Sequence, residues 1–221
     1  MIFQILAPEI EIITPIRDLK LSRQEEIEYL KGHGVSMSWE KAQYSVNKGL
    51  WGTSVGGSET ITSHLPLPDS AYPSQLKKSE PSKVKLTFEN GELVKIDDVA
   101  DSPVNNIVKL NDLASEYAIG RDIHVGDTII GIKGRVGFEA PAPLIIIKAH
   151  HTLEKHVLSK WQQHHKEYLS NWYGMLLHEG QYLDAVMRNI EAFLIDSQKN
   201  VNGDVFVSLH PYRFAIDGIS S

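Results

Sequence analysis

Apolar and polar residues alternate in two parts of the chain, and both patterns predict β-hairpins. Apolar side chains occupy every second position over 84–88, and Asn90-Gly91 follows, a pair that tolerates the positive φ angles of a tight turn. The returning strand is predicted over 93–96. Near the end of the sequence, 205–209 alternates in the same way and returns through 214–216. Because a short turn joins each pair, we expect antiparallel pairing in both.

The middle of the chain has apolar runs that are interrupted by glycine, arginine and proline. Residues 121–125, 128–133 and 144–148 predict three further strands, which glycine, aspartate and proline separate from one another. Asn111 is placed to cap a short helix that ends at Gly120. We expect the resulting sheet to be largely antiparallel.

Helical spacing dominates from His151 onward. Val186, Ile190, Phe193 and Leu194 fall on one helical face. Strands followed by helices and then by further strands are typical of an α+β fold. We therefore predict a largely antiparallel sheet with packed helices.

The first residues predict a βα unit. Residues 9–14 have strand character, and Ser22 and Glu25 form an S-x-x-E capping box that opens a helix. A lone βα unit cannot bury both faces of its strand. We therefore expect 1–34 to be the last piece of an α/β domain and 35–221 to form a separate domain.

Composition narrows the class of protein. With 42% hydrophobic and 23% charged residues, the chain of 221 residues is typical of a globular protein. Apolar runs such as 144–147 are too short for a membrane span and no signal peptide is recognisable, so we expect a soluble, cytoplasmic protein. The absence of cysteine excludes disulfides and thiolate chemistry. A net charge of −6 argues against a nucleic-acid surface and leaves small molecules or further copies of the chain as partners.

Five histidines lie in one predicted helical region, which raises the question of a metal site. A chelating pair on a helix needs spacing of four residues on one face, and no pair in this group has it. We therefore predict surface and capping histidines and no bound metal. The five are His150, His151, His156, His164 and His165.

Polar groups around the glycine-rich strands form a second candidate site. The segment 35–82 is predicted to be mostly loop, and a loop of this length is usually functional. Within it, Ser45 and Ser54 place hydroxyls at both ends of a short stretch, while Arg121 and Arg135 flank the glycine-rich strands. Hydroxyls and cations that converge suit an amino-acid ligand. Loop caps and surface charges are the alternative.

Four blocks of the sequence together resemble the argininosuccinate synthase family, in the same order as in that family. The resemblance covers nearly the whole chain. The blocks are ITPIRDLKLSRQEEIEYLKGHGV, YSVNKGLWGTS, IGRDIHVGDTIIGIKGRVGFEAPAP and IIIKAHHTLEKH.

The resemblance implies a ligase that is only partly represented here. In that family ATP, with Mg, adenylates the ureido oxygen of citrulline, and the aspartate amine then displaces AMP. ATP is held by an S-G-G-x-D-[TS]-S loop, which this sequence lacks. The resemblance identifies 1–34 with the end of the nucleotide-binding domain and 35–221 with the synthetase domain. It implies a homo-tetramer for the complete enzyme, built with a C-terminal arm that this sequence lacks, and an inactive isolated chain without a cofactor of its own.

The family's citrulline residues carry over in part. Ser45 and Ser54 match its two citrulline-binding serines, with the YS(x8)S spacing preserved. A glutamate in V-E-N-R and a tyrosine in R-G-x-Y-E also contact citrulline in the family, and Gly126 and Phe138 stand in their places. Asp127 is a possible substitute for the glutamate. Nothing in the sequence identifies a general base, so we assign no catalytic residue.

The change from glutamate to Gly126 leaves two interpretations open. In one, Asp127 compensates and the substrate is free citrulline. In the other, the space beside the α-amino group admits an Nα-acylated citrulline, which needs no carboxylate, and Arg121 or Arg135 faces the acyl group.

Two other classes of function stay open. The aromatic residues over 161–173 favour a non-catalytic interaction or oligomerisation module. A metallohydrolase that uses the histidine-rich helix has the weakest support, because the ligand spacing is missing.

Overall fold

The computed structural model describes residues 2–36, 44–127 and 133–221. The chain divides into two compact units, Met1–Gln43 and Tyr44–Ser221. Among the described residues, no helix is long and apolar enough to cross a membrane.

The regular elements of the first unit, within the part that the structure describes, are helices. It contains α1 (Ile2–Leu6), α2 (Pro15–Leu19) and α3 (Arg23–Gly32). The predicted capping box of α3 is confirmed: the Glu25 N–H donates to Ser22 Oγ, and the Ser22 N–H donates to the Glu25 carboxylate at 2.7 Å. Two otherwise unpaired N–H groups at the helix start are satisfied in this way.

The strand predicted over 9–14 is wrong. These residues, all of which the structure describes, lie outside any strand. A strand exists only where a neighbour accepts and donates its backbone hydrogen bonds, and the described part of this unit contains no other strand. Ile10, Ile12 and Ile13 are therefore exposed. Whether 1–34 is the end of a nucleotide-binding domain stays a prediction.

The second unit contains two antiparallel sheets, and the larger, sheet B, carries the main core. Its strand order is β5-β4-β3-β8-β9. Both predicted hairpins are confirmed, and the turn residues Asn90 and Gly91 have φ angles of 49° and 79°. The strands of sheet B are β3 (Ser82–Glu89), β4 (Glu92–Ile96), β5 (Val99–Ala100), β8 (Gly203–His210) and β9 (Arg213–Ser220).

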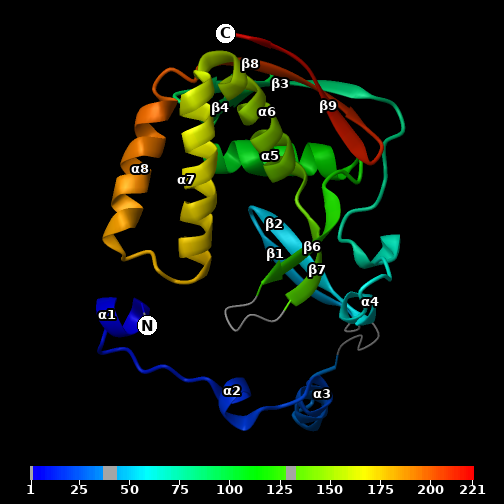
Figure 1. The fold of residues 1–221 in the computed structure, drawn as a ribbon. Helices are drawn as coiled ribbons and strands as arrows, with labels where there is room; N and C mark the ends of the chain where they lie inside the picture. Colours follow the sequence, from blue (N-terminus) through cyan, green and yellow to red (C-terminus); the bar gives the residue numbers. More distant parts are fainter. Residues whose placement is uncertain (1, 37–43, 128–132) are drawn as a thin grey trace. The chain divides into compact units, whose positions relative to one another are not determined.

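Helices α5 (Pro103–Ser115) and α6 (Pro141–Val157) cover one face of sheet B (Figure 1). The strand predicted over 144–148 is wrong, because these residues lie inside α6. A short apolar run fits a buried helix as well as a strand. The buried positions Ala142, Ile145, Ala149 and Leu153 show the helical spacing that decides between the two.

The predicted helix cap at Asn111 is also corrected. Asn111 lies inside α5, whose N-cap is Ser102. Its side chain instead accepts the N–H of Ala142, at the start of α6, and donates to the Leu50 carbonyl, both at 3.0 Å. Asn111 therefore links α5 to the start of α6 and to the backbone at Leu50.

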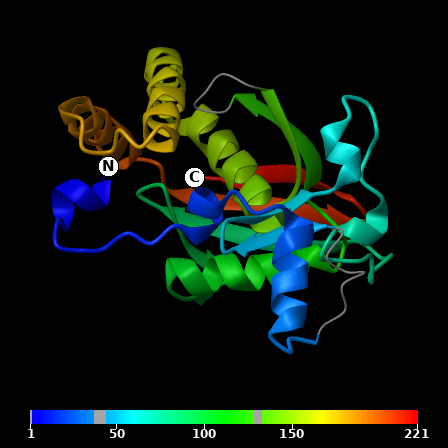
Figure 2. The same cartoon turned by 90° about the horizontal axis from the view of Figure 1, so that it is seen from below.

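Helices α7 (Lys160–His178) and α8 (Ala185–Gln198) form the predicted helical region and lie side by side in both views (Figures 1 and 2). The predicted apolar face of α8 is confirmed at three of its four positions, since Ile190 is buried and Phe193 and Leu194 are half-buried. Met187 and Ile190 are buried, whereas Val186 is exposed. The α+β prediction as a whole is confirmed.

The smaller sheet, sheet A, has the strand order β1-β2-β7-β6. The strand predicted over 121–125 is confirmed inside β6, while 128–132 of the next predicted strand lie outside the described residues. Of the predicted loop 35–82, the described part 44–82 is less irregular than predicted, because short glycine- and serine-containing strands pair through their backbones without strong apolar alternation. The bounds are β1 (Ser45–Gly49), β2 (Gly52–Gly56), α4 (Ser58–Ile61), the 3-10 helix η2 (Asp69–Ala71), β6 (Arg121–Asp127) and β7 (Lys133–Glu139).

Candidate functional site

All seven residues of the predicted substrate site lie on sheet A. Side chains alternate between the two faces of a strand, and residues directly opposite each other in neighbouring strands share a face. The register therefore assigns each residue to one face. The seven are Ser45 on β1, Ser54 on β2, Arg121, Gly126 and Asp127 on β6, and Arg135 and Phe138 on β7.

One face, here called the serine face, contains Ser45, Asn47, Ser54, Gly126 and Phe138. Ser54 lies opposite both Asn47 and Phe138, and the Asn47 amide donates to Ser54 Oγ at 3.4 Å. Ser45 shares this face because it is two residues from Asn47 on β1. Phe138 lies opposite Asp122 of β6, and Gly126 shares the face because it is four residues further along that strand.

The opposite face, here called the arginine face, contains Arg121, Asp127 and Arg135. The sequence already contained the signal that separates the two sets. Arg135 and Phe138 are three residues apart on one strand, and Arg121 and Gly126 are five apart on another. An odd separation along a strand places two side chains on opposite faces.

A covering segment, residues 57–76, packs on the arginine face. Val55 is fully buried there against Leu67 and Tyr72 of this segment. Burial raises the pKa of the Tyr72 phenol above its ordinary value, and the positive charge of Arg121 opposes that shift. The arginine face is therefore a small apolar core, whereas no such cluster of buried residues lies on the described serine face.

Both arginines are bonded to the covering segment. The Arg135 guanidinium donates to the backbone carbonyls of Glu59, Thr62 and Leu65, the last at 3.1 Å. Arg121 donates to the Ser74 carbonyl. Guanidinium groups held in this way fasten the segment to the sheet.

Glu139 is a residue of this region that sequence reasoning missed. Its carboxylate is only 5% exposed and accepts hydrogen bonds from the Ser74 hydroxyl at 2.5 Å and from Arg121 Nε at 3.3 Å. It follows Phe138 directly, so it lies on the arginine face. Its position at the end of β7 gave no sign of burial, because its partners are distant in the sequence.

Two cavities open on sheet A. The first, of about 710 Å³, is lined by Asn47, Trp51, Ser54 and Phe138 among others, at the β1–β2 hairpin. The second, of about 650 Å³, lies between the tips of β6 and β7 and the C-terminal end of α7. Both are bordered by residues of the serine face.

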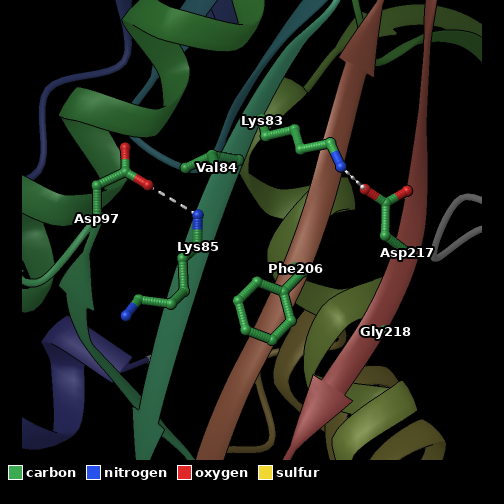
Figure 3. A pocket seen from close by; sticks show the side chains of 7 residues that line it. All are labelled: Lys83, Val84, Lys85, Asp97, Phe206, Asp217 and Gly218. Atoms are coloured by element: carbon green, nitrogen blue, oxygen red, sulfur yellow. Dashed lines mark hydrogen bonds and ion pairs between the residues drawn. The ribbon is translucent and has the colours of Figure 1, made fainter.

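A third cavity, of about 350 Å³, lies on the outer face of sheet B (Figure 3). Its cations are already paired: Lys83 Nζ is 3.8 Å from Asp217 Oδ2, and Lys85 Nζ is 2.5 Å from the Asp98 carboxylate. None of the predicted site residues lines it.

A buried polar cluster lies where α6, which contains His150 and His151, meets α7 and α8. Glu154 of α6 accepts from Lys166 of α7 at 2.9 Å and from Gln198 of α8 at 2.8 Å, and the ring of His150 lies 3.7 Å away. Burial lowers the pKa of His150 and of its neighbour His151 below the ordinary value. Within the described ranges, no group of three or more potential ligands could hold a metal ion.

The chain thus has an α+β fold in which hydroxyl and amide groups lie beside an aromatic ring on one sheet face, an arrangement typical of domains that bind small polar molecules. A family model described as Arginosuccinate synthase C-terminal domain matches residues 44–221. The chain belongs to the argininosuccinate synthase family.

Individual relatives agree with this assignment. An argininosuccinate synthase of Dictyoglomus turgidum is 38% identical over 218 residues, which are 98% of this chain and 55% of the relative. One from Methanocaldococcus jannaschii is 35% identical over 209 residues, covering 93% of this chain and 53% of the relative. One from Pyrococcus furiosus is 34% identical over 208 residues, covering 92% of this chain and 50% of the relative. The chain thus spans about half the length of the curated relatives it matches.

Proposed function

We propose that this chain is the C-terminal part of a carbon–nitrogen ligase that joins citrulline and aspartate in arginine biosynthesis. The reaction consumes ATP: adenylation of the ureido oxygen releases pyrophosphate, and the aspartate amine then displaces AMP to give argininosuccinate. The family assignment supports the reaction class. The isolated chain is proposed to be inactive and cytoplasmic, and the complete enzyme to be a homo-tetramer.

The observation that carries the proposal is the geometry of the serine face. Ser45 and Ser54, which match the family's citrulline-binding serines, lie on adjacent strands and on the same face. Phe138 lies directly opposite Ser54 and contributes an apolar surface. Two hydroxyls beside a ring suit a ligand with a polar head and an aliphatic chain, such as citrulline.

The glycine-rich stretch 53–58 does not fit the phosphates of ATP. The stretch does lead from β2 into α4, but α4 has only four residues. The Glu59 carboxylate lies beside the turn, 2.9 Å from where a Cβ on Gly57 would be. A carboxylate at this position repels a phosphate. ATP with Mg is therefore assigned to another part of the complete enzyme, and no chemical step is assigned to residues of this chain.

A non-catalytic interaction module is the second candidate, and α7 favours it. Every residue of α7 is described and none is buried. Trp161, Tyr168 and Trp172 are 65%, 58% and 45% exposed, and their spacing places them on one face of the helix. Exposed aromatic faces are typical of protein contacts, so α7 also supports the proposed homo-tetramer.

Calorimetric titration with citrulline tests the proposed function. We expect Ser54→Ala to weaken binding by about tenfold, because one hydrogen bond to a polar ligand is lost. Thr53→Val is the matched control, since it removes a hydroxyl from the opposite face of the same strand. Equal affinities of the two variants, or no heat of binding with the unmodified chain, would contradict the proposal.

A further inference from the structure

The cavity between α7 and the tips of β6 and β7 has a floor without side chains. Gly126 and Gly134 lie directly opposite each other in the two strands. His124, two residues before Gly126 on the same face, forms one wall, and Met175 and His178 of α7 are on the other side. The cavity is large enough for a small substituent of a ligand on the serine face, at about 650 Å³.

The imidazole of His124 occupies the space that a side chain at position 126 would need. A Cβ built on Gly126 would lie 2.5 Å from His124 Nε2, whereas a Cβ on Gly134 would meet no described atom within 4 Å. Gly126 is not among the residues with positive φ, so its backbone does not require glycine. The glycine therefore serves to let the imidazole lie over the strand.

The carboxylates around this cavity already have partners. Asp127 pairs with Lys133 at 2.5 Å, and Glu179 accepts from Gln181 at 2.7 Å. Asp122, the next acidic residue along β6, accepts the Ile123 N–H at 2.7 Å. A carbonyl oxygen entering the cavity would find imidazole N–H donors in His124 and His178, while Asp127, the acidic neighbour of Gly126, is already neutralised by Lys133.

We propose that this cavity binds the acyl group of an Nα-acylated citrulline. The acyl carbonyl accepts a hydrogen bond from His124, and the acyl chain packs against Met175 over the glycine floor. His124 is then a specificity-determining residue that favours substrates with an acyl carbonyl on the α-nitrogen. This inference rests on the proposed function, because it assumes that citrulline lies on the serine face.

Titration of the full chain with L-citrulline and with Nα-acetyl-L-citrulline, followed by NMR, tests the inference. We expect the acetylated compound to bind at least about tenfold more tightly. Gly126→Glu displaces the imidazole and adds a carboxylate, so the preference should reverse toward citrulline. His124→Ala, at an exposed position, should abolish the preference without affecting the fold. Gly218→Ala is the matched control: it adds a Cβ outside the cavity, on β9 of sheet B, where it would meet no described atom within 4 Å, and it should leave the preference unchanged.

The outcomes separate this inference from the proposed function. If the unmodified chain binds citrulline as tightly as the acetylated compound, or more tightly, the inference is overturned and the proposed function stands. If neither compound shifts any resonance of the serine face, both are overturned. If His124→Ala leaves the preference unchanged, or if Gly218→Ala changes it as much as Gly126→Glu does, the role of His124 is refuted.

Discussion

Glu154 shows how single residues hold the three long helices together. Its carboxylate is 1% exposed and is bonded to one side chain from α7 and one from α8. A buried charge is tolerated only when partners of this kind compensate for lost hydration. His150 lies against the same carboxylate and also contacts Gln198 at 2.9 Å.

The stability of the chain should fall when the pH is lowered through about 6.5. Burial lowers the pKa of His150 from its ordinary value of 6.5, although the Glu154 charge opposes the shift. A base with a lowered folded-state pKa binds fewer protons when folded, so its contribution is present above the unfolded pKa and is lost as the pH falls. Urea unfolding at pH 7.5 and 5.5 measures the effect.

His150→Gln provides the comparison for this pH dependence. It should reduce the loss of stability between the two pH values, whereas His164→Gln, on the exposed side of α7, should not. His151 also has a lowered pKa, so part of the dependence should persist. An unchanged dependence in His150→Gln would assign the effect to other groups.

At the scale of elements, sheet A depends on how the covering segment is fastened. Glu139, Arg121 and Ser74 form the contact between β7, β6 and this segment. We expect Glu139→Ala to destabilise the segment by about 2–4 kcal/mol, because the mostly buried Arg121 loses its buried carboxylate partner and keeps only the exposed Asp69 carboxylate among the described residues.

Hydrogen exchange locates the effect of Glu139→Ala. Amides of 57–76 and of β7 should exchange faster, while those of β3 and β8 in sheet B should keep their protection. Glu92→Ala, at an exposed position of β4, is the control and should change neither set. A uniform increase in exchange across both sheets would show that the contact does not act locally.

Local sequence signals predicted some elements and missed others for identifiable reasons. The hairpin around Asn90-Gly91 combines alternation with a turn that only a few residues permit, so it was predictable. The run 144–148 was not, because a short apolar run fits two structures. The roles of Ser45 and Ser54 rest on the placement of their hydroxyls and on family resemblance and stay predictions, whereas the burial of Glu139 depends on partners far away in the sequence. Arg121 and Arg135 lie on the opposite face from Gly126 and Phe138 because an odd number of positions separates each arginine from its counterpart on the same strand.

At the scale of the whole molecule, the candidate site and the main core lie on different sheets. The large core joins sheet B to α5 and α6, while sheet A has its own small cluster around Val55. Substitutions on the serine face should therefore alter binding with little effect on the core. This separation makes the site testable in the chain as it stands, although the chain spans about half of its relatives.

The central claim is that the serine face binds citrulline. An NMR chemical-shift map of the chain during titration with citrulline tests it most directly. We predict that the perturbed amides gather at Ser45, Ser54 and Phe138, with small changes in the covering segment and in sheet B. Perturbations centred on the outer face of sheet B, or an unchanged spectrum at millimolar citrulline, would contradict the claim.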